Sequence, residues 1–179
     1  MDGDQGLVAA AQAGDDGAFV ALVRQQTPAV HRTAARLLSD RGAVEEVVQE
    51  VWLSVWVHLS GFSGHSAFTT WLYRVTVNTA ANSRRREASR PAVPVAPQDL
   101  PSPAAASAET RTEEAELVTA VRIAIRRLPE RQRAVVVLRD LEGLSYEQTA
   151  QVLQMNVPGV KSALHRGRTA LAASLTGWR

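Results

Sequence analysis

The residues of this chain with the clearest chemistry lie in a basic segment, residues 144–169. The spacing of its apolar residues predicts two short helices joined by a tight turn. Ser145, with Gln148 three residues on, is suited to cap the first helix, and Asn156 is suited to cap the second. The outer face of the second helix then carries Lys161, Ser162, His165, Arg166 and Arg168. A helix face that offers only donors and positive charge suits the DNA major groove, between two rows of phosphates.

A helical hairpin with a solvated basic face would show the same pattern. This segment alone therefore leaves two interpretations open, DNA binding and a purely structural role. Its turn contains an unusual residue. Helices commonly end with a residue in the left-handed conformation, often Gly, and here Gln154 occupies that position. If Gln154 keeps that conformation, we expect it to cost roughly 1 kcal/mol relative to Gly.

A second group of residues combines aromatic rings with arginines. Six of the nine aromatic residues lie between Trp52 and Tyr73, and three consecutive arginines occupy positions 84–86. Rings that stack on bases, next to arginines that meet phosphates, are the side chains that bind single-stranded nucleic acid. Since aromatic residues also fill cores, we expect most of the six to be buried and one or two to lie at a functional surface.

A third group is acidic and belongs to a strongly amphipathic helix predicted over residues 43–59. Its polar side, with the adjacent positions, carries Glu45, Glu46, Gln49, Glu50 and Leu53. The net charge of the chain, +2, is unevenly placed: residues 91–110 carry −2 and residues 111–179 carry +4. Separate acidic and basic patches suggest two different partners, although a solvated charged surface explains either patch alone.

The composition limits the class of protein. The chain of 179 residues suits one domain or two small ones, and without cysteine it has no disulfide framework or thiolate site. We find no signal peptide and no apolar run long enough to span a bilayer, so we expect a cytoplasmic protein without membrane insertion. The four histidines are scattered, and there is no zinc spacing or phosphate-binding loop. We therefore expect no enzymatic activity, no cofactor and no metal.

The elements that must position these groups are all predicted to be helices. Residues 1–14 are small and polar and are expected to form at most a single helical turn. Five of the eight prolines lie within residues 91–110, so we expect residues 91–111 to be a flexible linker. The predicted fold is all-α, with two small helical domains, residues 1–90 and 112–179, joined by this Pro/Ala-rich linker. The second domain contains the helix-turn-helix.

The further helices are expected from about 15 to 38 with a kink or a new start at Thr27-Pro28, then over 67–87, 112–128 and 130–141.

Several motifs in order resemble a bacterial sigma factor of the extracytoplasmic-function type, within the sigma-70 family. The resemblance covers about 160 residues and rests on four segments. These are VEEVVQEVWLSVW from Val44, FSGHSAFTTWLYRVTVN from Phe62, LPERQRAVVVLRDLEGLSYEQTAQVL from Leu128 and VKSALHRGR from Val160. One such motif would be weak, but four in order around a Pro-rich linker are specific.

The resemblance implies a role for each of the three groups. It implies that residues 1–90 bind core polymerase and the −10 element, and that residues 112–179 bind the −35 element and the β flap. Core binding would fall to Glu45, Glu46, Gln49, Glu50 and Leu53. The −10 residues would be Phe62, Ser63, Gly64, His65, Trp71, Arg74, Asn78, Arg84, Arg85 and Arg86. The −35 residues would be Ser145, Tyr146, Pro158, Gly159, Lys161, Ser162, His165, Arg166 and Arg168.

The partners that the resemblance implies are core RNA polymerase, through its β′ coiled coil and β flap, and promoter DNA, both duplex and non-template single strand. An anti-sigma factor is also implied. The acidic linker would thread toward the RNA path. The chain departs from the family pattern at Gly159 and Ala163, positions that commonly face DNA, so fewer side-chain contacts are expected there. The Gly159 amide could instead approach a phosphate.

Two other hypotheses come from different classes. A stand-alone helix-turn-helix regulator that binds duplex DNA as a dimer would leave the acidic helix and the aromatic segment without a role. A pure interaction protein, such as an anti-sigma-like adaptor with a vestigial basic helix, would leave the basic face unused. Transcription with purified core polymerase would separate these hypotheses from a promoter-specificity subunit.

Overall fold

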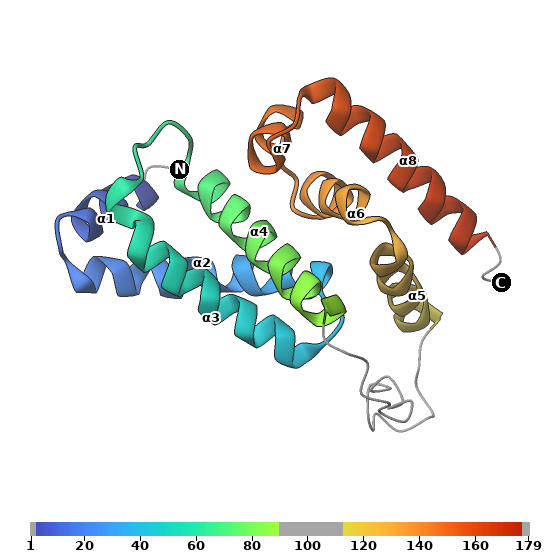
Figure 1. Cartoon of the computed structure of the whole chain (residues 1–179), viewed down its shortest axis with the longest axis horizontal. Helices are drawn as coiled ribbons and strands as arrows, with labels where there is room; N and C mark the ends of the chain where they lie inside the picture. Colours follow the sequence, from blue (N-terminus) through green and yellow to red (C-terminus); the bar gives the residue numbers. More distant parts are fainter. Residues whose placement is uncertain (1–2, 90–112, 177–179) are drawn as a thin grey trace.

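The computed structural model describes residues 3–89 and 113–176, and every regular element in these two ranges is helical. The first half of the chain forms α1 to α4, and the second half forms α5 to α8, which lie alongside them (Figure 1). The all-α prediction is confirmed. The predicted linker, residues 91–111, lies outside the described residues.

The first helix was not expected from the sequence. Instead of at most one helical turn, α1 spans Gly3–Gln12 and packs against α2, Asp16–Leu37, with Val8 buried between them. The Gln25 and Gln26 side-chain amides donate to the Asp4 carboxylate at 2.8 and 3.0 Å. Such a short helix is marginal alone, so its packing against α2 stabilises it.

A single helix, α2, runs through the Thr27-Pro28 pair, so of the two expected alternatives the start of a second helix at this pair is wrong. Asp15 caps it by accepting from the Ala18 amide at 3.0 Å. Pro28 has no amide to donate to the Arg24 carbonyl one turn back, and next to it the Thr27 hydroxyl donates to the Val23 carbonyl at 2.7 Å. Burial of Leu22, Val30 and Ala34 against the neighbouring helices holds the two halves of α2 together.

The helices predicted over 43–59 and 67–87 are present as α3, Arg41–His58, and α4, Phe68–Ser89. A short 3-10 turn, Leu59–Gly61, and an irregular loop connect them. The two helices pack on each other and on α2. The apolar face of α3 is buried as its periodicity indicated, through Val44, Val47, Val48, Val51 and Val55. Trp52, which shares that face, is only half-buried.

In the second half, α5 spans Glu113–Arg127 and α6 spans Glu130–Val136. A π-helical turn, Val137–Leu141, continues α6 where an ordinary helix was expected. The Glu142 amide donates to the Val137 carbonyl at 2.9 Å, and Gly143, with φ +74°, then turns the chain. The helix-turn-helix follows as α7, Tyr146–Leu153, and α8, Val157–Leu175.

One apolar core joins the two halves of the chain, although the sequence predicted two domains. Buried residues of the second half belong to the same cluster as the core of the first half, and a smaller cluster lies within α6 to α8. The shared residues are Ile125, Ala134, Val137, Leu138, Leu144 and Val152. Consistent with this, α4 lies beside α7, and α2 contacts α5 (Figure 1).

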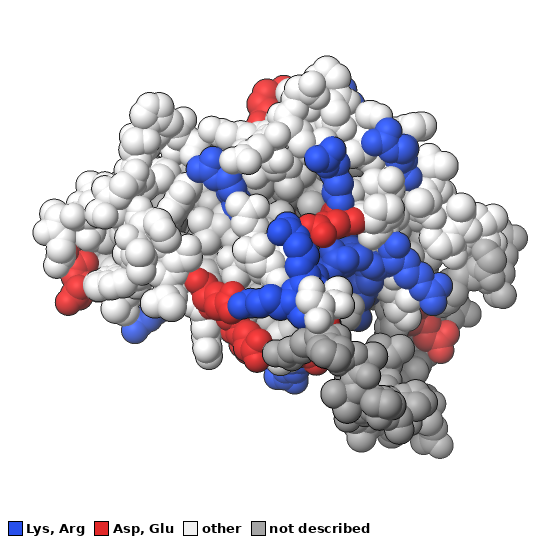
Figure 2. Space-filling model, in the orientation of Figure 1, with Lys and Arg blue, Asp and Glu red and all other residues white. Residues whose placement is uncertain are grey.

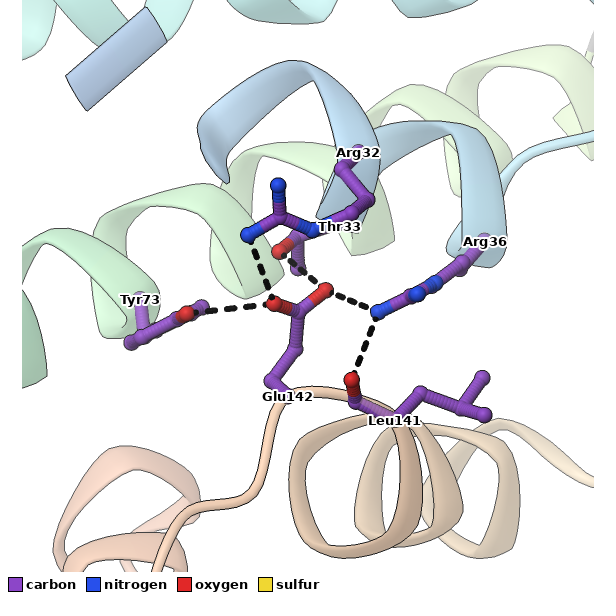
Figure 3. A network of polar contacts seen from close by, with 6 residues as sticks. All are labelled: Arg32, Thr33, Arg36, Tyr73, Leu141 and Glu142. Atoms are coloured by element: carbon purple, nitrogen blue, oxygen red, sulfur yellow. Dashed lines mark hydrogen bonds and ion pairs between the residues drawn. The ribbon is translucent and has the colours of Figure 1, made fainter. Parts of the chain in front are cut away.

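A network of polar contacts lies at this junction, centred on the Glu142 carboxylate (Figure 3). The side chain of Glu142 is only 2% exposed. It accepts from the Thr33 hydroxyl at 3.0 Å and the Tyr73 hydroxyl at 3.2 Å. Arg36 donates to it at 2.5 Å and to the Leu141 carbonyl at 3.0 Å, while Arg32 lies at 3.4 Å. Donors from α2 and α4 thus surround an acid of the second half.

Arg133 makes a second polar contact across the junction. Its guanidinium donates to the Leu37 carbonyl, at the end of α2, and to the Leu128 carbonyl, both at 3.0 Å, and also to the Arg126 carbonyl. Burial lowers the pKa of Arg133 to about 10, with the nearby Arg84 charge as the next cause. The side chain therefore remains charged at neutral pH, where it satisfies carbonyls at the ends of two helices.

The Tyr73 hydroxyl should report on the junction. Burial, and then the charge of Glu142, raise the pKa of Tyr73 to about 12 from its usual 10. Because the folded-state pKa is raised, the stability that Tyr73 contributes is present below pH 10 and is lost as the pH rises through 12. In a Tyr146→Phe variant, where Tyr73 is the remaining tyrosine, phenolate absorbance should show a midpoint near 12.

Adding Glu142→Gln should lower this midpoint while leaving it above 10, because burial remains the larger cause. Circular dichroism along the titration checks that the helices persist. If Tyr73 titrates with a midpoint near 10 in the Tyr146→Phe variant while its helices persist, the buried contact between Tyr73 and Glu142 is contradicted.

Candidate nucleic-acid and protein interfaces

The helix-turn-helix forms through the local interactions that its sequence predicted. The Ser145 hydroxyl accepts from the Gln148 amide at 3.1 Å, and the Gln148 side chain accepts from the Ser145 amide at 2.8 Å. The Asn156 side chain caps α8 by accepting from the Gly159 amide at 2.8 Å, with Pro158 in the first turn. Gln154 is left-handed, with φ 52° and ψ 45°. The predicted capping box is therefore confirmed, and Gln154 keeps the left-handed conformation on which its expected cost depended.

The residues predicted on the outer, basic face of α8 are exposed there: Lys161, Ser162, His165, Arg166 and Arg168. They differ in how freely they could bind a ligand. The Arg166 guanidinium donates to the Ser162 hydroxyl at 2.6 Å and lies on an open surface. Arg168 makes two bonds to the Asp140 carboxylate, at 2.9 and 2.5 Å, and this partner raises its pKa. A ligand that contacts Arg168 must compete with Asp140.

Tyr146, at the start of α7, is half-buried, and two cations lie close to its ring. The Arg139 guanidinium is 4.2 Å from the centre of its ring, and the Lys161 ammonium is 5.3 Å away. These cation–π contacts connect α7 to α8 at the surface next to the basic face. Ser145, at the N-terminus of α7, is half-buried. Pro158, at the N-terminus of α8, is exposed.

The interpretation of Ala163 as a residue that faces DNA is wrong for this structure. Ala163 is fully buried in the cluster that packs α6, α7 and α8 together, so a larger side chain would not point outward. The amide of Gly159 is also not free for a phosphate, because it already caps α8 through Asn156. A Cβ at Gly159 would lie 2.7 Å from the Asn156 side-chain oxygen, so a larger residue there would require this capping side chain to shift.

The loop before α4 carries the residues predicted to capture a base: Phe62, Ser63, Gly64 and His65. Gly64 has φ +72°, a left-handed backbone conformation that residues with a side chain rarely adopt. The Ser63 hydroxyl and the His65 ring lie 2.5 Å apart, and both are exposed. Gln12 of α1 fixes the start of this loop by donating to the Leu59 and Phe62 carbonyls at 2.9 and 2.8 Å.

Sequence reasoning missed Gln12 because nothing local marks it, and its carbonyl partners lie about fifty positions along the chain. With Gln12 in place, α1 and the loop line a pocket of about 220 Å³.

Three aromatic rings gather behind the loop. The Phe62 ring lies 5.2 Å from that of Trp71 and 6.0 Å from that of Phe68. Phe68 is buried, while Phe62 and Trp71 are half-buried, as is Tyr73 in the junction. Trp56 is the most exposed of the six rings, at 54%. The expectation that few of these rings lie at the surface is therefore confirmed.

The remaining residues predicted to meet the −10 element follow α4 toward its end: Arg74, Asn78, Arg84, Arg85 and Arg86. Arg74 is half-buried. Asn78, Arg84 and Arg85 line a cleft of about 370 Å³ against the second half. Both arginines lie 3.9 Å from the Glu130 carboxylate. Figure 2 shows positive side chains gathered around this junction, with acids among them.

The acidic face of α3 is exposed, as predicted, at Glu45, Glu46, Gln49 and Leu53, while Glu50 is half-buried. Glu45 pairs with His31 at 3.2 Å. Glu50 accepts two bonds from Arg86, at 2.8 and 2.9 Å, so two residues assigned to different partners pair with each other. The structure adds an apolar strip, because Leu53, Trp56 and Val57 are 65%, 54% and 60% exposed.

Trp56 was absent from the predicted site, although its place between Leu53 and Val57 on a helix with acidic neighbours was a usable signal.

Among the residues that the structure describes, no helix combines the length and apolar character needed to cross a membrane.

Two family descriptions match this chain, sigma-70 region 2 over residues 22–90 and sigma-70 region 4 over residues 119–171. The chain is 36% identical over 176 residues to the ECF RNA polymerase sigma-E factor of Escherichia coli (strain K12), covering 94% of this chain and 92% of that protein. It is 34% identical over 185 residues to the RNA polymerase sigma-H factor of Pseudomonas aeruginosa, covering 96% and 93%.

The fold is similar to that of solved proteins. The structure of CnrH in complex with the cytosolic domain of CnrY matches with a TM-score of 0.75 and 24% identity, over 99% of this chain and 100% of that chain. The sigma factor RpoE from Bartonella quintana, solved in complex with the anti-sigma factor NepR, matches with a TM-score of 0.67 and 22% identity, over 90% and 98%.

The turn of the helix-turn-helix gives a test of local energetics. Gln154→Gly should stabilise the protein by roughly 1 kcal/mol, because glycine adopts the left-handed conformation without a Cβ penalty. The same change at Gln151, exposed within α7, should destabilise it by roughly 0.5–1 kcal/mol, because glycine is a poor helix former. Urea denaturation of both variants measures the difference. Equal signs for the two changes would contradict the left-handed turn.

Proposed function

This chain belongs to the extracytoplasmic-function sigma factors of the sigma-70 family, and on that premise we propose that it binds core RNA polymerase, recognises −10 and −35 promoter elements and promotes DNA melting. The observation that carries the proposal is the presence of three chemically distinct surfaces on one chain. They are the acidic and apolar face of α3, the aromatic loop with the arginines of α4, and the basic face of α8.

The outer face of α3 suits a basic protein partner. Leu53, Trp56 and Val57 are exposed beside Glu46 and the other acids, which gives an apolar strip with an acidic border. Apolar residues supply most of the affinity of such an interface, and charges set association rate and register. We assign this face to core polymerase, through the β′ coiled coil, and residues 1–90 to core and −10 binding.

The loop at Phe62–His65 and the following α4 suit a melted strand. Capture of a flipped base requires a pocket and stacking rings, and unstacking costs a few kcal/mol. The pocket between α1 and the loop, lined by the rings of Phe62 and Phe68, supports this role. Arginines of α4 would then meet phosphates of the non-template strand.

The second half suits duplex DNA at the −35 element. The outer face of α8 presents the exposed side chains of Lys161, Ser162 and Arg166. A helix of this kind reads base edges in the major groove while its neighbours position the backbone. Residues 112–179 would also contact the β flap, with residues 91–111 as the connection.

An anti-sigma factor is a further proposed partner. The sigma factor RpoE of Bartonella quintana, whose fold is similar, was solved in complex with an anti-sigma factor. This similarity of fold supports the proposed anti-sigma partner. The protein would act in the cytoplasm, where RNA polymerase and DNA are found.

Run-off transcription with purified core polymerase tests the proposed function. Added protein should bind core and start transcription from specific genomic fragments. If it neither binds core nor starts transcription from any fragment, the proposal is wrong.

Charge reversal on α3 tests core binding. Glu46→Lys should weaken binding to core polymerase by roughly tenfold, because it places like charges against a basic surface. The change should leave thermal stability intact, since Glu46 is exposed. Glu87→Lys, an exposed acid of α4 outside the acidic face of α3, is the matched control and should bind core polymerase as the wild type does. Equal affinities of the two variants would count against this assignment.

Removal of one arginine tests the −35 surface. Arg166→Ala should weaken binding to an active promoter fragment, with the slope of log affinity against log salt reduced by about one if it contacts a phosphate. Arg168→Ala should have a smaller effect, because Asp140 already holds that side chain. Fluorescence anisotropy over a salt series measures both. A larger loss for Arg168→Ala would show that α8 meets DNA through a different face.

A further inference from the structure

One face of α1 forms a wall of the pocket of about 220 Å³ that lies between this helix and the loop before α4. The α1 residues in this wall recur at the spacing of a single helical face: Gln5, Val8, Ala9 and Gln12. The opposite wall consists of Phe62, Ser63, Gly64, Ser66, Ala67 and Phe68. The match to sigma-70 region 2 begins at residue 22, so it does not include α1 and assigns no role to it.

The lining of this pocket suits a single nucleic-acid base. A base has two apolar faces, which stack on rings, and a polar edge that carries donors and acceptors. Val8, Phe62 and Phe68 give the pocket apolar surface, while the Gln5 amide and the Ser66 hydroxyl are polar groups in its walls. Its volume lies below the range of about 300–1,000 Å³ that holds drug-sized ligands, so one base fits it better than a larger molecule.

The α1 wall is held on the body of the protein by contacts that do not involve the loop. Val8 is 5% exposed and belongs to the main apolar core. The Asp4 carboxylate accepts from the side-chain amides of Gln25 and Gln26 on α2, at 2.8 and 3.0 Å. Since α2 fixes α1 in place, residues on the exposed face of α1 can orient a base that enters the pocket.

The two glutamines of this wall differ in what their amides can still bind. The Gln12 amide nitrogen donates to the Leu59 and Phe62 carbonyls, at 2.9 and 2.8 Å, so both of its N–H groups are used to hold the start of the loop. Gln5 is exposed and lies two helical turns before Gln12. An exposed amide can donate to and accept from a base edge at the same time, as glutamine does with adenine.

We propose that Gln5 is a specificity-determining residue, whose amide reads the edge of a base flipped out of the −10 element, and that Gln12 is a positioning residue, which holds the capturing loop against α1. The identity of the ligand rests on the proposed function, because it is a base of the melted non-template strand. The first helix thereby becomes the second wall of the −10 site.

Run-off transcription by core polymerase with the full chain tests the role of Gln5. The templates are an active promoter fragment and copies in which each base of the −10 element is changed in turn to the other three. Gln5→Ala should reduce discrimination among bases at one position by roughly fivefold or more, because the amide contact to the base edge is lost. Discrimination at the other positions should not change. Gln151→Ala, an exposed glutamine of α7, is the matched control and should keep the wild-type preference at every position.

Binding of the same holoenzyme to a promoter fragment with a single-stranded −10 region tests the role of Gln12. Gln12→Ala should weaken binding roughly tenfold, and so should Gln12→Glu, which keeps the size of the side chain but loses the donating amide. A set of copies that each lack one −10 base separates positioning from a general defect. On the copy without the captured base, both variants should bind as the wild type does, because there is no base for the loop to hold. Fluorescence anisotropy measures each affinity.

Circular dichroism checks that each variant keeps its helices, and binding to single-stranded −10 fragments with the same base changes measures discrimination if Gln5→Ala transcribes weakly. Wild-type discrimination at every position in Gln5→Ala would overturn the role of Gln5. An equal loss of affinity for all the copies that lack a base would overturn the positioning role of Gln12. Both results differ from failure of the wild type to start transcription, which would overturn the proposed function and the base-binding role of α1 with it.

Discussion

The buried carboxylate of Glu142 is the interaction on which the arrangement of this molecule depends. It follows a π-helical turn and precedes Gly143, whose left-handed backbone redirects the chain into the helix-turn-helix. The donors that satisfy it come from α2 and α4, so this residue ties the second half to the first just before α7 begins. An acid at this point would be too costly to bury without those donors.

Several charged residues proposed to meet partners form ion pairs within the free chain. Glu50 binds Arg86, Arg168 binds Asp140, and Glu130 lies near two arginines of α4. These pairs lie at or near the surface and contribute little to stability, so their exchange for a phosphate or a protein charge is inexpensive. The free fold can therefore keep its functional charges neutralised without preventing their later use.

Local patterns predicted most of the fold. The apolar period placed α3 and α4, and Ser145 and Asn156 fixed the ends of α7 and α8 through bonds to neighbouring residues. The first helix was missed because its stability comes from packing on α2. The continuity of α2 through Pro28 was likewise decided by burial, which outweighs the loss of one helical bond.

The sequence by itself determined the helices, their caps and the chemistry of the three surfaces, because these depend on residues within a few positions of each other. Only the tertiary structure decided which surfaces are open. Glu142 meets Thr33 and Tyr73, and Gln12 meets Phe62, across separations that no local pattern records. Ala163 belongs to the core for the same reason, since burial on a helix depends on what packs against it.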